Sequence, residues 1–431
     1  MTSRGACAEA YAIGVLRQLG IAAAPDGAAD DPALSWRRAG LMSVTGRPDD
    51  AGLVCPAALA SAADGALLAL KALTDRPDRL PLNGALLLGE RARLLGLRRG
   101  GRISANGSCR LLQAADGRLA LSLAREDDWT LLPALLDCGG APDWAAVERL
   151  VARKPACGMV ARGIELGMAI ALDRPPAPAE RLFPALPPLA RNAESRPLVL
   201  DLSSLWAGPL AGSLLGMLGA RVVKVEALGR PDGARLGNRR FYDLLNGGKE
   251  SVALDFDDPA GRAALRRLVA RADIVIEASR PRALRQLGIA RETEIARGAV
   301  WVALTGHGGV EAAGRIAFGD DAAIAAGLAS VMERGWGEAI FAGDAIADPL
   351  AGLHAALGAW AAWRCGGARL VEISLSETLA HAIAAETAEP PVLRDWQARA
   401  EADPAPLYDM RDVMRPAARF GADTDRILAA C

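Results

Sequence analysis

Asp348 is the residue whose type and position point most directly to chemistry. The segment FAGDAIADPLAGLHAALG, residues 341–358, places Asp344 and Asp348 in front of a long apolar, alanine-rich run. A carboxylate can attack an activated acyl carbon and hold it covalently, which divides one group transfer into two steps. At the N-terminus of a helix, unpaired backbone N–H groups would stabilise the negative charge that develops during such an attack. The simpler alternative is an N-cap, because Asp348 directly precedes Pro349 and proline suits the first helical position.

An internal repeat separates these two interpretations. Residues 39–73 align without a gap with residues 326–360, at a constant offset of 287 residues, and Asp348 aligns with Ser61. Serine caps a helix about as well as aspartate does, but it carries no carboxylate. We therefore expect both copies to begin a helix and only the later copy to retain an acid for catalysis.

Several other catalytic motifs are missing from the sequence. There is no G-x-S-x-G nucleophile elbow. His307, His354 and His381 lack the spacing of metal ligands, so we interpret them as polar packing residues and expect no metal. The seven cysteines include no C-x-x-C pair and are interpreted as reduced thiols.

The strand–helix pattern of the chain also suits a dinucleotide-binding enzyme, which is the main alternative to a carboxylate nucleophile. The first strand-to-helix turn, SSLWAGPLAGSLLG (203–216), does not contain G-x-G-x-x-G, and Pro209 removes an N–H that would bind pyrophosphate. Glu226 ends the second predicted strand, where a ribose-binding acid would lie. This single match does not support a dinucleotide site.

The composition limits the class of partner. The chain is 51% hydrophobic and has a net charge of −1, so no electrostatic argument favours nucleic acid or an anionic membrane. The first residues lack the basic start and apolar core of a signal peptide, and no run approaches the length of a membrane span. We expect a soluble, cytoplasmic protein.

Predicted strands and helices alternate after residue 197. The segments PLVLDLS, RVVKVEA, DIVIEAS and AVWVALTG have the pattern of buried strands. GPLAGSLLGMLGA is typical of a helix, as is DPAGRAALRRLVARA, which Asp258 and Pro259 would begin. This order predicts a parallel sheet with helices on both faces, where ligands bind outside the carboxyl ends of the strands.

The part of the chain before residue 172 has a different pattern. Residues 109–124 alternate around Asp116-Gly117, which predicts a hairpin of antiparallel strands, and helical segments flank it. This pattern indicates a smaller α+β domain. Residues 172–197 contain repeated prolines, which exclude regular helix or central strand and predict an extended linker.

The order of these segments resembles the family III CoA-transferases, a group that includes CaiB/BaiF proteins, formyl-CoA transferases and α-methylacyl-CoA racemases. The resemblance is carried by VLDLSSLWAGPLAGSLLGMLGARVVKVEALGRPDG, LLNGGKESVALDFDDPAGRAALRRLVARADIVIEASRPRALRQLGI and GDAIADPLAGLHAALGAW. It implies an α/β fold that joins a Rossmann-like, parallel-sheet large domain to a smaller α+β domain, here in rearranged order. The implied parts are a degenerate copy of the catalytic-segment helices (1–80), the small domain (81–171), the Pro-rich linker (172–197), the CoA-binding large domain with the catalytic segment (198–385) and a C-terminal tail (386–431).

The resemblance also implies a reaction. Asp348 matches the family's catalytic aspartate, which attacks the donor thioester to give a mixed anhydride and then carries CoA as an aspartyl thioester. The expected function is CoA transfer from an acyl-CoA to a carboxylic acid, by a protein that forms an interlocked homodimer. Two alternatives stay open: an acyl-CoA racemase or isomerase of the same fold, and a non-catalytic CoA-binding subunit.

The resemblance assigns CoA contacts to separate segments. Gly100, Gly101 and Gly107 would correspond to a glycine-rich flap, or are plain loop glycines. Trp206 is alternatively a buried core aromatic. Arg280 and Arg285 alternatively lie on a solvated helix face. The assigned contacts are Trp206, Ala207, Leu254, Asp255, Ala278, Ser279, Arg280, Arg285, Asp320 and Asp321.

Two departures from the family pattern matter. Asp320, in FGDDAA, replaces a histidine that racemases carry, and racemisation needs a base on each face of the α-carbon, so transfer is favoured. Adjacent Asp320 and Asp321 could raise one another's pKa if buried, or they are exposed helix-start acids. Ala227 follows Glu226 where transferases often have an arginine for the nucleotide.

Overall fold

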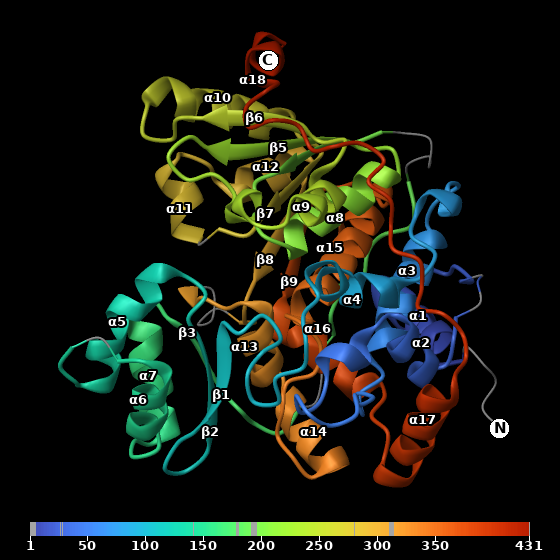
Figure 1. Ribbon diagram of the computed structural model, residues 1–431. Coiled ribbons are helices and arrows are strands. Elements are labelled where there is room, and N and C mark those ends of the chain that lie inside the picture. Colours follow the sequence, from blue (N-terminus) through green and yellow to red (C-terminus); the bar gives the residue numbers. More distant parts are fainter. Residues whose placement is uncertain are drawn as a thin grey trace.

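A six-stranded parallel sheet organises the larger part of the chain (Figure 1). The structure is a computed structural model that describes residues 6–430 except 26, 28, 141, 178–180, 191–195, 280 and 310–313. Every neighbouring pair of strands in this sheet is parallel, which confirms the expected Rossmann-like large part. In spatial order the strands are β6 (Glu250–Leu254), β5 (Arg221–Ala227), β4 (Leu198–Asp201), β7 (Ile274–Glu277), β8 (Val300–Thr305) and β9 (Arg369–Ser374).

Helices cover both faces of this sheet. Alternate strand residues enter different cores: Val199 of β4 belongs to the core that contains α8 and α15, whereas Leu200 belongs to the core that contains α10 and the C-terminal α18. Asp258 caps α10 through the N–H of Gly261, as predicted. The helices of this region are α8 (Ala207–Met217), α9 (Arg239–Asn246), α10 (Pro259–Arg271), α11 (Pro281–Gln286), α12 (Arg291–Arg297), α15 (Ala347–Arg364) and α18 (Thr424–Ala429), and η3 (Gly233–Leu236) is a short 3-10 turn.

A three-stranded antiparallel sheet forms the smaller α+β part. The predicted hairpin is confirmed, because β1 (Cys109–Gln113) pairs with β2 (Arg118–Ser122) across Asp116-Gly117, and β3 (Ala169–Leu172) completes the sheet. One face packs on three helices, and the other contributes to a core with α13 (Gly319–Ala325) and α14 (Leu328–Trp336). The three helices are α5 (Glu126–Leu136), α6 (Trp144–Val151) and α7 (Ala156–Glu165).

The repeat seen in the sequence is also a repeat of structure. α2 (Pro32–Arg38) and α13 begin and end at aligned positions, and each is followed by a left-handed glycine, Gly40 with φ 83° and Gly327 with φ 91°. The short helix η1 (Leu41–Val44) then aligns with the start of α14, and α3 (Leu59–Lys71) with α15. α3 and α15 pack together inside one core.

Further helices surround this central pair. α1 (Ala6–Leu19) packs on α3 as α8 packs on α15. Figure 1 shows α1 to α4 gathered beside α15 and α16. The remaining elements are η2 (Pro77–Arg79), α4 (Gly84–Leu95), α16 (Leu375–Ala385) and α17 (Pro390–Ala402). No described helix is both long enough and apolar enough to span a bilayer.

The described part of the Pro-rich linker is anchored on the core. After β3 ends at Leu172, the described linker residues form neither helix nor strand, as predicted. Phe183 is buried and stacks on His354, with ring centroids 6.3 Å apart, and its ring lies against Gly358 of α15. The backbone N–H of Leu186 donates to the carbonyl of Leu19.

Candidate active site

Asp348 lies in the first turn of α15, but it is not the N-cap. The helix begins at Ala347 with Ile346 as its cap residue, and no side chain caps it. The N-cap interpretation was therefore wrong. Pro349 at the third helical position is tolerated because its missing N–H would have no partner in the first turn.

A second helix end holds the carboxylate of Asp348. The N–H of Gly319, the first residue of α13, donates to Oδ2 of Asp348 at 3.0 Å. A Cβ at residue 319 would lie 2.3 Å from the carbonyl oxygen of Ala345 and 2.5 Å from Oδ2 of Asp348. Glycine is needed here because the backbone of α13 touches the carboxylate. Asp348 as a residue is partly exposed, whereas its helical neighbours are buried.

A strained turn connects the two helix ends. Ala345 has φ 41°, a left-handed conformation that is costly for a residue with a Cβ. Its N–H donates to Oδ1 of Asp320 at 2.9 Å, and its carbonyl accepts from the N–H of Asp348 at 2.9 Å. The turn therefore fixes Asp320 and Asp348 relative to each other.

Arg91 of α4 brings a positive charge to the acidic cluster, which consists of Asp320, Asp344 and Asp348. Its Nε and Nη2 donate to the two carboxylate oxygens of buried Asp344 at 2.7 and 2.5 Å. The guanidinium also lies over the ring of Trp206, 4.5 Å from the centroid. Arg91 thus joins the segment before α15 to the turn between β4 and α8.

Asn106 reaches the same cluster from the glycine-rich loop. Its Nδ2 donates to Oδ2 of Asp320 at 2.8 Å and to Oδ1 of Asp344 at 3.4 Å. The loop is tied down by Gly101, whose carbonyl accepts from the N–H of Phe341 at 2.9 Å. The segment that includes Gly100, Gly101 and Gly107 therefore borders the acids of its own chain.

Burial sets the ionisation of the cluster. Burial raises the pKa of Asp348 to about 7, opposed by Arg91 and the Gly319 N–H and reinforced by Asp320 and Asp344. Burial and the neighbouring Asp344 raise the pKa of Asp320 to about 6, opposed by Arg91, Asn106 and the Ala345 N–H. Desolvation disfavours the charged form, and like charges add to the effect. Asp348 therefore gains and loses its proton near neutral pH.

Asp321 has a different environment from its neighbour Asp320. Burial raises its pKa to about 8, and its Oδ1 accepts the N–H of Phe318 at 2.8 Å. Its Oδ2 is buried without a hydrogen-bond partner. Both aspartates are buried, so the alternative of exposed helix-start acids is wrong. Within the described residues, no group of histidine, cysteine, aspartate or glutamate side chains could hold a metal ion.

The other predicted contacts lie at the carboxyl edge of the parallel sheet. Trp206 is buried under Arg91 with its edge against Phe241, and Ala207 begins α8. Asp255 and Ala278 are exposed, each just beyond a strand end, with Leu254 and Ser279 beside them. Arg285 on α11 is also exposed, 3.8 Å from Glu292, and Arg280 lies outside the described residues.

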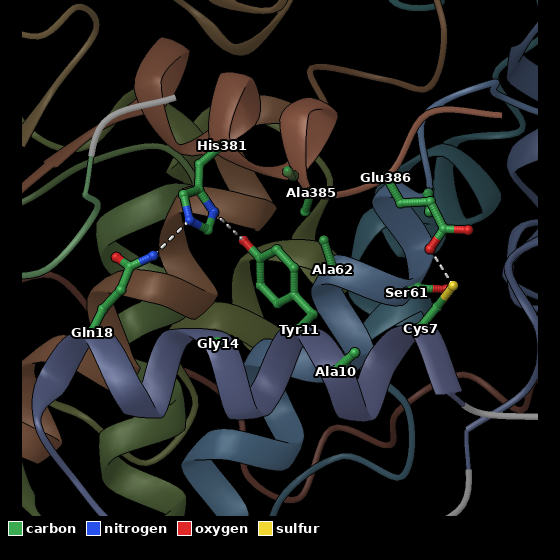
Figure 2. A pocket seen from close by; sticks show the side chains of 12 residues that line it. Cys7, Ala10, Tyr11, Gly14, Gln18, Ser61, Ala62, His381, Ala385 and Glu386 are labelled. Atoms are coloured by element: carbon green, nitrogen blue, oxygen red, sulfur yellow. Dashed lines mark hydrogen bonds between the residues drawn. The ribbon is translucent and has the colours of Figure 1, made fainter. Parts of the chain in front are cut away.

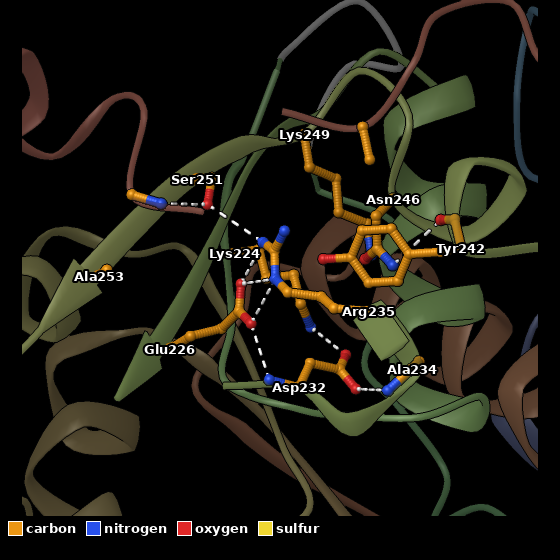
Figure 3. Close-up of polar contacts among 12 residues, drawn as sticks. Lys224, Glu226, Asp232, Ala234, Arg235, Tyr242, Asn246, Lys249, Ser251 and Ala253 are labelled. Carbon is orange, nitrogen blue, oxygen red and sulfur yellow. Dashed lines mark hydrogen bonds and ion pairs between the residues drawn. The ribbon is translucent and has the colours of Figure 1, made fainter. Parts of the chain in front are cut away.

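Figure 3 shows a network of polar contacts around Lys224, Glu226 and Asp232. This network also fixes the turn that carries Trp206. Nζ of Lys224 donates to the carbonyl of Ser203 at 2.8 Å and pairs with Asp232 at 2.9 Å. Asp232 in turn accepts the N–H of Leu205 at 3.0 Å.

The same network occupies Glu226. Arg235 pairs with its carboxylate at 2.5 Å, and the N–H of Asp232 donates to it at 2.9 Å. Glu226 is therefore held by protein groups at the position where a dinucleotide site would need an acid for the ribose.

Comparison with known proteins identifies the family. The family model described as CoA-transferase family III matches residues 197–424, more than half of the chain. The chain belongs to CoA-transferase family III. The matched region of this family III chain contains Trp206, Asp320, Asp344 and Asp348, whereas Arg91 and Asn106 lie before it.

Curated relatives match part of the chain. The succinyl-CoA–D-citramalate CoA-transferase of Chloroflexus aurantiacus is 32% identical over 193 residues, which cover 42% of this chain and 48% of the relative. The succinyl-CoA:glutarate CoA-transferase of Homo sapiens is 34% identical over 167 residues, covering 36% of this chain and 38% of that protein. A crystal structure of a hypothetical protein from Mycobacterium tuberculosis has 30% identity and a TM-score of 0.39, over 43% of this chain and 55% of that one. The family III chain thus spans about half the length of these curated relatives, or less.

Arg91 and Asn106 are site residues that sequence reasoning missed. Asn106 lies inside the loop that the glycines had marked, so its position carried a signal. Arg91 lies in the middle of α4, more than two hundred residues before the acids it contacts, and no local pattern distinguishes it from other arginines.

Proposed function

We propose that this chain moves CoA from an acyl-CoA donor to a carboxylic acid, with Asp348 as the covalent nucleophile. The observation that carries the proposal is the hydrogen bond of 3.0 Å by which the Gly319 N–H holds the carboxylate of Asp348, a partly exposed residue of a family III chain. A pKa of about 7 makes this carboxylate more basic than an ordinary aspartate, and still largely ionised above neutral pH.

The proposed reaction balances in four steps. An oxygen of Asp348 attacks the thioester carbonyl, the C–S bond breaks, and CoA leaves as a thiolate beside an aspartyl–acyl anhydride. The thiolate attacks the Asp348 carbonyl, which releases the donor acid and leaves an aspartyl-CoA thioester. The acceptor carboxylate attacks that thioester, which forms an aspartyl–acceptor anhydride as the C–S bond breaks and the thiolate is freed again. The thiolate then attacks the acceptor's carbonyl, so acyl-CoA leaves and the Asp348 carboxylate is restored.

Neighbouring groups have separate roles in this proposal. Arg91 keeps a fixed positive charge near the site, which favours the ionised form of Asp348. The turn at Ala345 and the Gly319 N–H orient the carboxylate, because both are short backbone contacts that leave little freedom. Asn106 ties the glycine-rich loop to Asp320, so that loop would border the acyl group.

We propose that CoA lies along the carboxyl edge of the parallel sheet. Ala207 lies against Gly352 of α15, four residues after Asp348, because α8 and α15 pack together there. The exposed residues after β6 and β7, with Arg285, would meet the nucleotide end, where a guanidinium can bind phosphate. We also propose that the chain forms a homodimer and acts in the cytoplasm.

An activity assay tests the proposal with a matched control. Succinyl-CoA is the first donor to try, with glutarate and D-citramalate as acceptors, because the named relatives use these compounds. Asp348→Asn should abolish CoA transfer. Asp143→Asn, at the N-cap of α6, should retain it, because asparagine caps as well as aspartate. Full activity in Asp348→Asn would refute the nucleophile. CoA binding without transfer from any acyl-CoA tested would favour a non-catalytic subunit.

A further inference from the structure

A pocket lies at the start of α3, which is the counterpart of α15 in the first copy of the repeat (Figure 2). Its volume is about 270 Å³, and residues of α1, α3 and α16 line it. It shares no lining residue with the acidic cluster around Asp348. Figure 2 shows Ser61, Cys7 and Glu386 at one end of the pocket and Gln18 and His381 at the other.

One end of the pocket holds polar groups that lack strong partners. Ser61, which aligns with Asp348, is 2% exposed, and its Oγ has no hydrogen-bond partner. The carboxylate of Glu386 accepts a hydrogen bond from the Cys7 thiol. Burial raises the pKa of Cys7 to about 12, so the thiol keeps its proton. Within the described residues, Glu386 has no arginine or lysine as an ion-pair partner.

The other end of the pocket is neutral and already hydrogen-bonded. Tyr11 Oη lies 2.9 Å from Nε2 of His354 and 3.1 Å from Nδ1 of His381. Gln18 Nε2 lies 2.8 Å from Nε2 of His381. Burial lowers the pKa of His354 to about 4 and also lowers the pKa of His381, so both rings are neutral near pH 7. The net charge of the pocket lining is therefore that of Glu386.

We propose that this pocket binds a small primary amine, with its ammonium group between Glu386 and Ser61 and its short apolar chain along the alanine-lined wall. An ammonium offers three N–H donors, which suit the carboxylate oxygens and the free Ser61 Oγ. Ala10, Ala58 and Ala62 give the wall an apolar surface of small side chains. A carboxylate ligand would meet the like charge of Glu386, so this site selects against the acids that the catalytic site is proposed to use.

A ligand-observed NMR titration tests the amine site on the full chain. The probe is n-butylammonium in phosphate buffer, compared with n-butanol and butyrate at equal concentration. Saturable binding of the ammonium alone is expected. Glu386→Gln should weaken it by roughly tenfold or more, since it removes a charge-assisted bond, and Ser61→Ala by roughly three- to tenfold.

Two further variants control for position and folding. Ala385→Leu fills the pocket from its exposed rim without touching the charge, and should also weaken binding. Asp348→Asn should leave the amine affinity unchanged, which separates this pocket from the main acidic cluster. Melting curves identify any variant that has lost its fold. The inference is overturned by no saturable binding to the wild type, by n-butanol binding as tightly as the ammonium, or by an unchanged affinity in folded Glu386→Gln.

Discussion

The backbone N–H of Gly319 donates to Oδ2 of Asp348 at 3.0 Å, so the first residue of α13 holds the carboxylate in the first turn of α15. This contact joins two elements that begin 28 residues apart, Gly319 and Ala347, and it depends on a residue without a side chain. Both helix ends face one acid, which places a carboxylate where backbone N–H dipoles can stabilise negative charge.

Gly319→Ala should therefore damage the site. The new Cβ would lie 2.3 Å from a backbone oxygen of Ala345, which cannot rotate away, and 2.5 Å from Oδ2 of Asp348. We expect CoA transfer to fall by on the order of tenfold to a hundredfold, because the carboxylate is displaced. Steady-state rates measure this. Gly139→Ala is the control, since nothing lies within 4 Å of its Cβ. Equal rates in both variants would mean that the contact is unimportant.

The pH dependence of transfer should report Asp348 and its neighbour Arg91. Attack requires the ionised carboxylate, so activity should rise as pH increases through about 7. Arg91 lowers this pKa, and Arg91→Gln should therefore move the rising limb to higher pH. Arg93→Gln, on the same helix but bonded to the carbonyl of Tyr408, should leave the limb in place. A pH–rate profile that is identical in all three proteins would contradict this assignment.

Asp321→Asn should stabilise the protein at high pH. The pKa of Asp321 is raised to about 8 in the folded chain, whereas an unfolded aspartate ionises near pH 4. The folded form keeps a proton that the unfolded form has lost, so this residue's contribution to stability falls as pH rises from about 4 to 8. Asparagine does not ionise, so the free energy of unfolding of Asp321→Asn should increasingly exceed that of the wild type over this pH window. The difference should reach on the order of 2–4 kcal/mol.

Urea denaturation of wild type and Asp321→Asn at several pH values measures this difference. Asp320 and Asp348 also have raised pKa values. In Asp321→Asn the free energy of unfolding should therefore still fall as pH rises, but less steeply than in the wild type. A gain that is the same at pH 4 and pH 8 would show that Asp321 does not carry the effect.

CoA transfer should occur without exchange of the α-proton of the acyl group. Both oxygens of Asp320 are occupied, one by the Ala345 N–H and the other by Asn106, so this acid is poorly placed to act as a second base. Incubation with acyl-CoA in deuterium oxide, followed by mass spectrometry of the thioester, checks this. Deuterium incorporation at a rate equal to or above transfer would favour the racemase or isomerase alternative.

Much of the large part was predictable because its signals are local. RVVKVEA matches the bounds of β5, and Asp258 with Pro259 marks the start of α10. The alternation around Asp116-Gly117 likewise predicted the hairpin of β1 and β2. The sheet edges gave weaker signals: β9, Arg369–Ser374, is partly exposed and less apolar, and pattern alone did not predict it.

The site itself was only partly predictable. The repeat indicates a chemical role for Asp348, because the aligned Ser61 could serve as a helix cap but has no carboxylate. Arg91 and Asn106 could not be paired with Asp344 and Asp320 from the sequence, because these contacts join residues more than two hundred positions apart. The N-cap error has a local cause: proline is tolerated throughout the first turn, so Pro349 did not fix where α15 begins.

Covalent catalysis by Asp348 is tested most directly by following oxygen atoms into its carboxylate. An acceptor acid labelled with oxygen-18 in its carboxylate is incubated with unlabelled acyl-CoA and the protein, and peptides are then analysed by mass spectrometry. If Asp348 is the nucleophile, oxygen-18 will accumulate in the peptide containing Asp348 during turnover, since each cycle leaves an acceptor oxygen on that carboxylate. Formation of the new acyl-CoA with no label in that peptide would contradict covalent catalysis by Asp348.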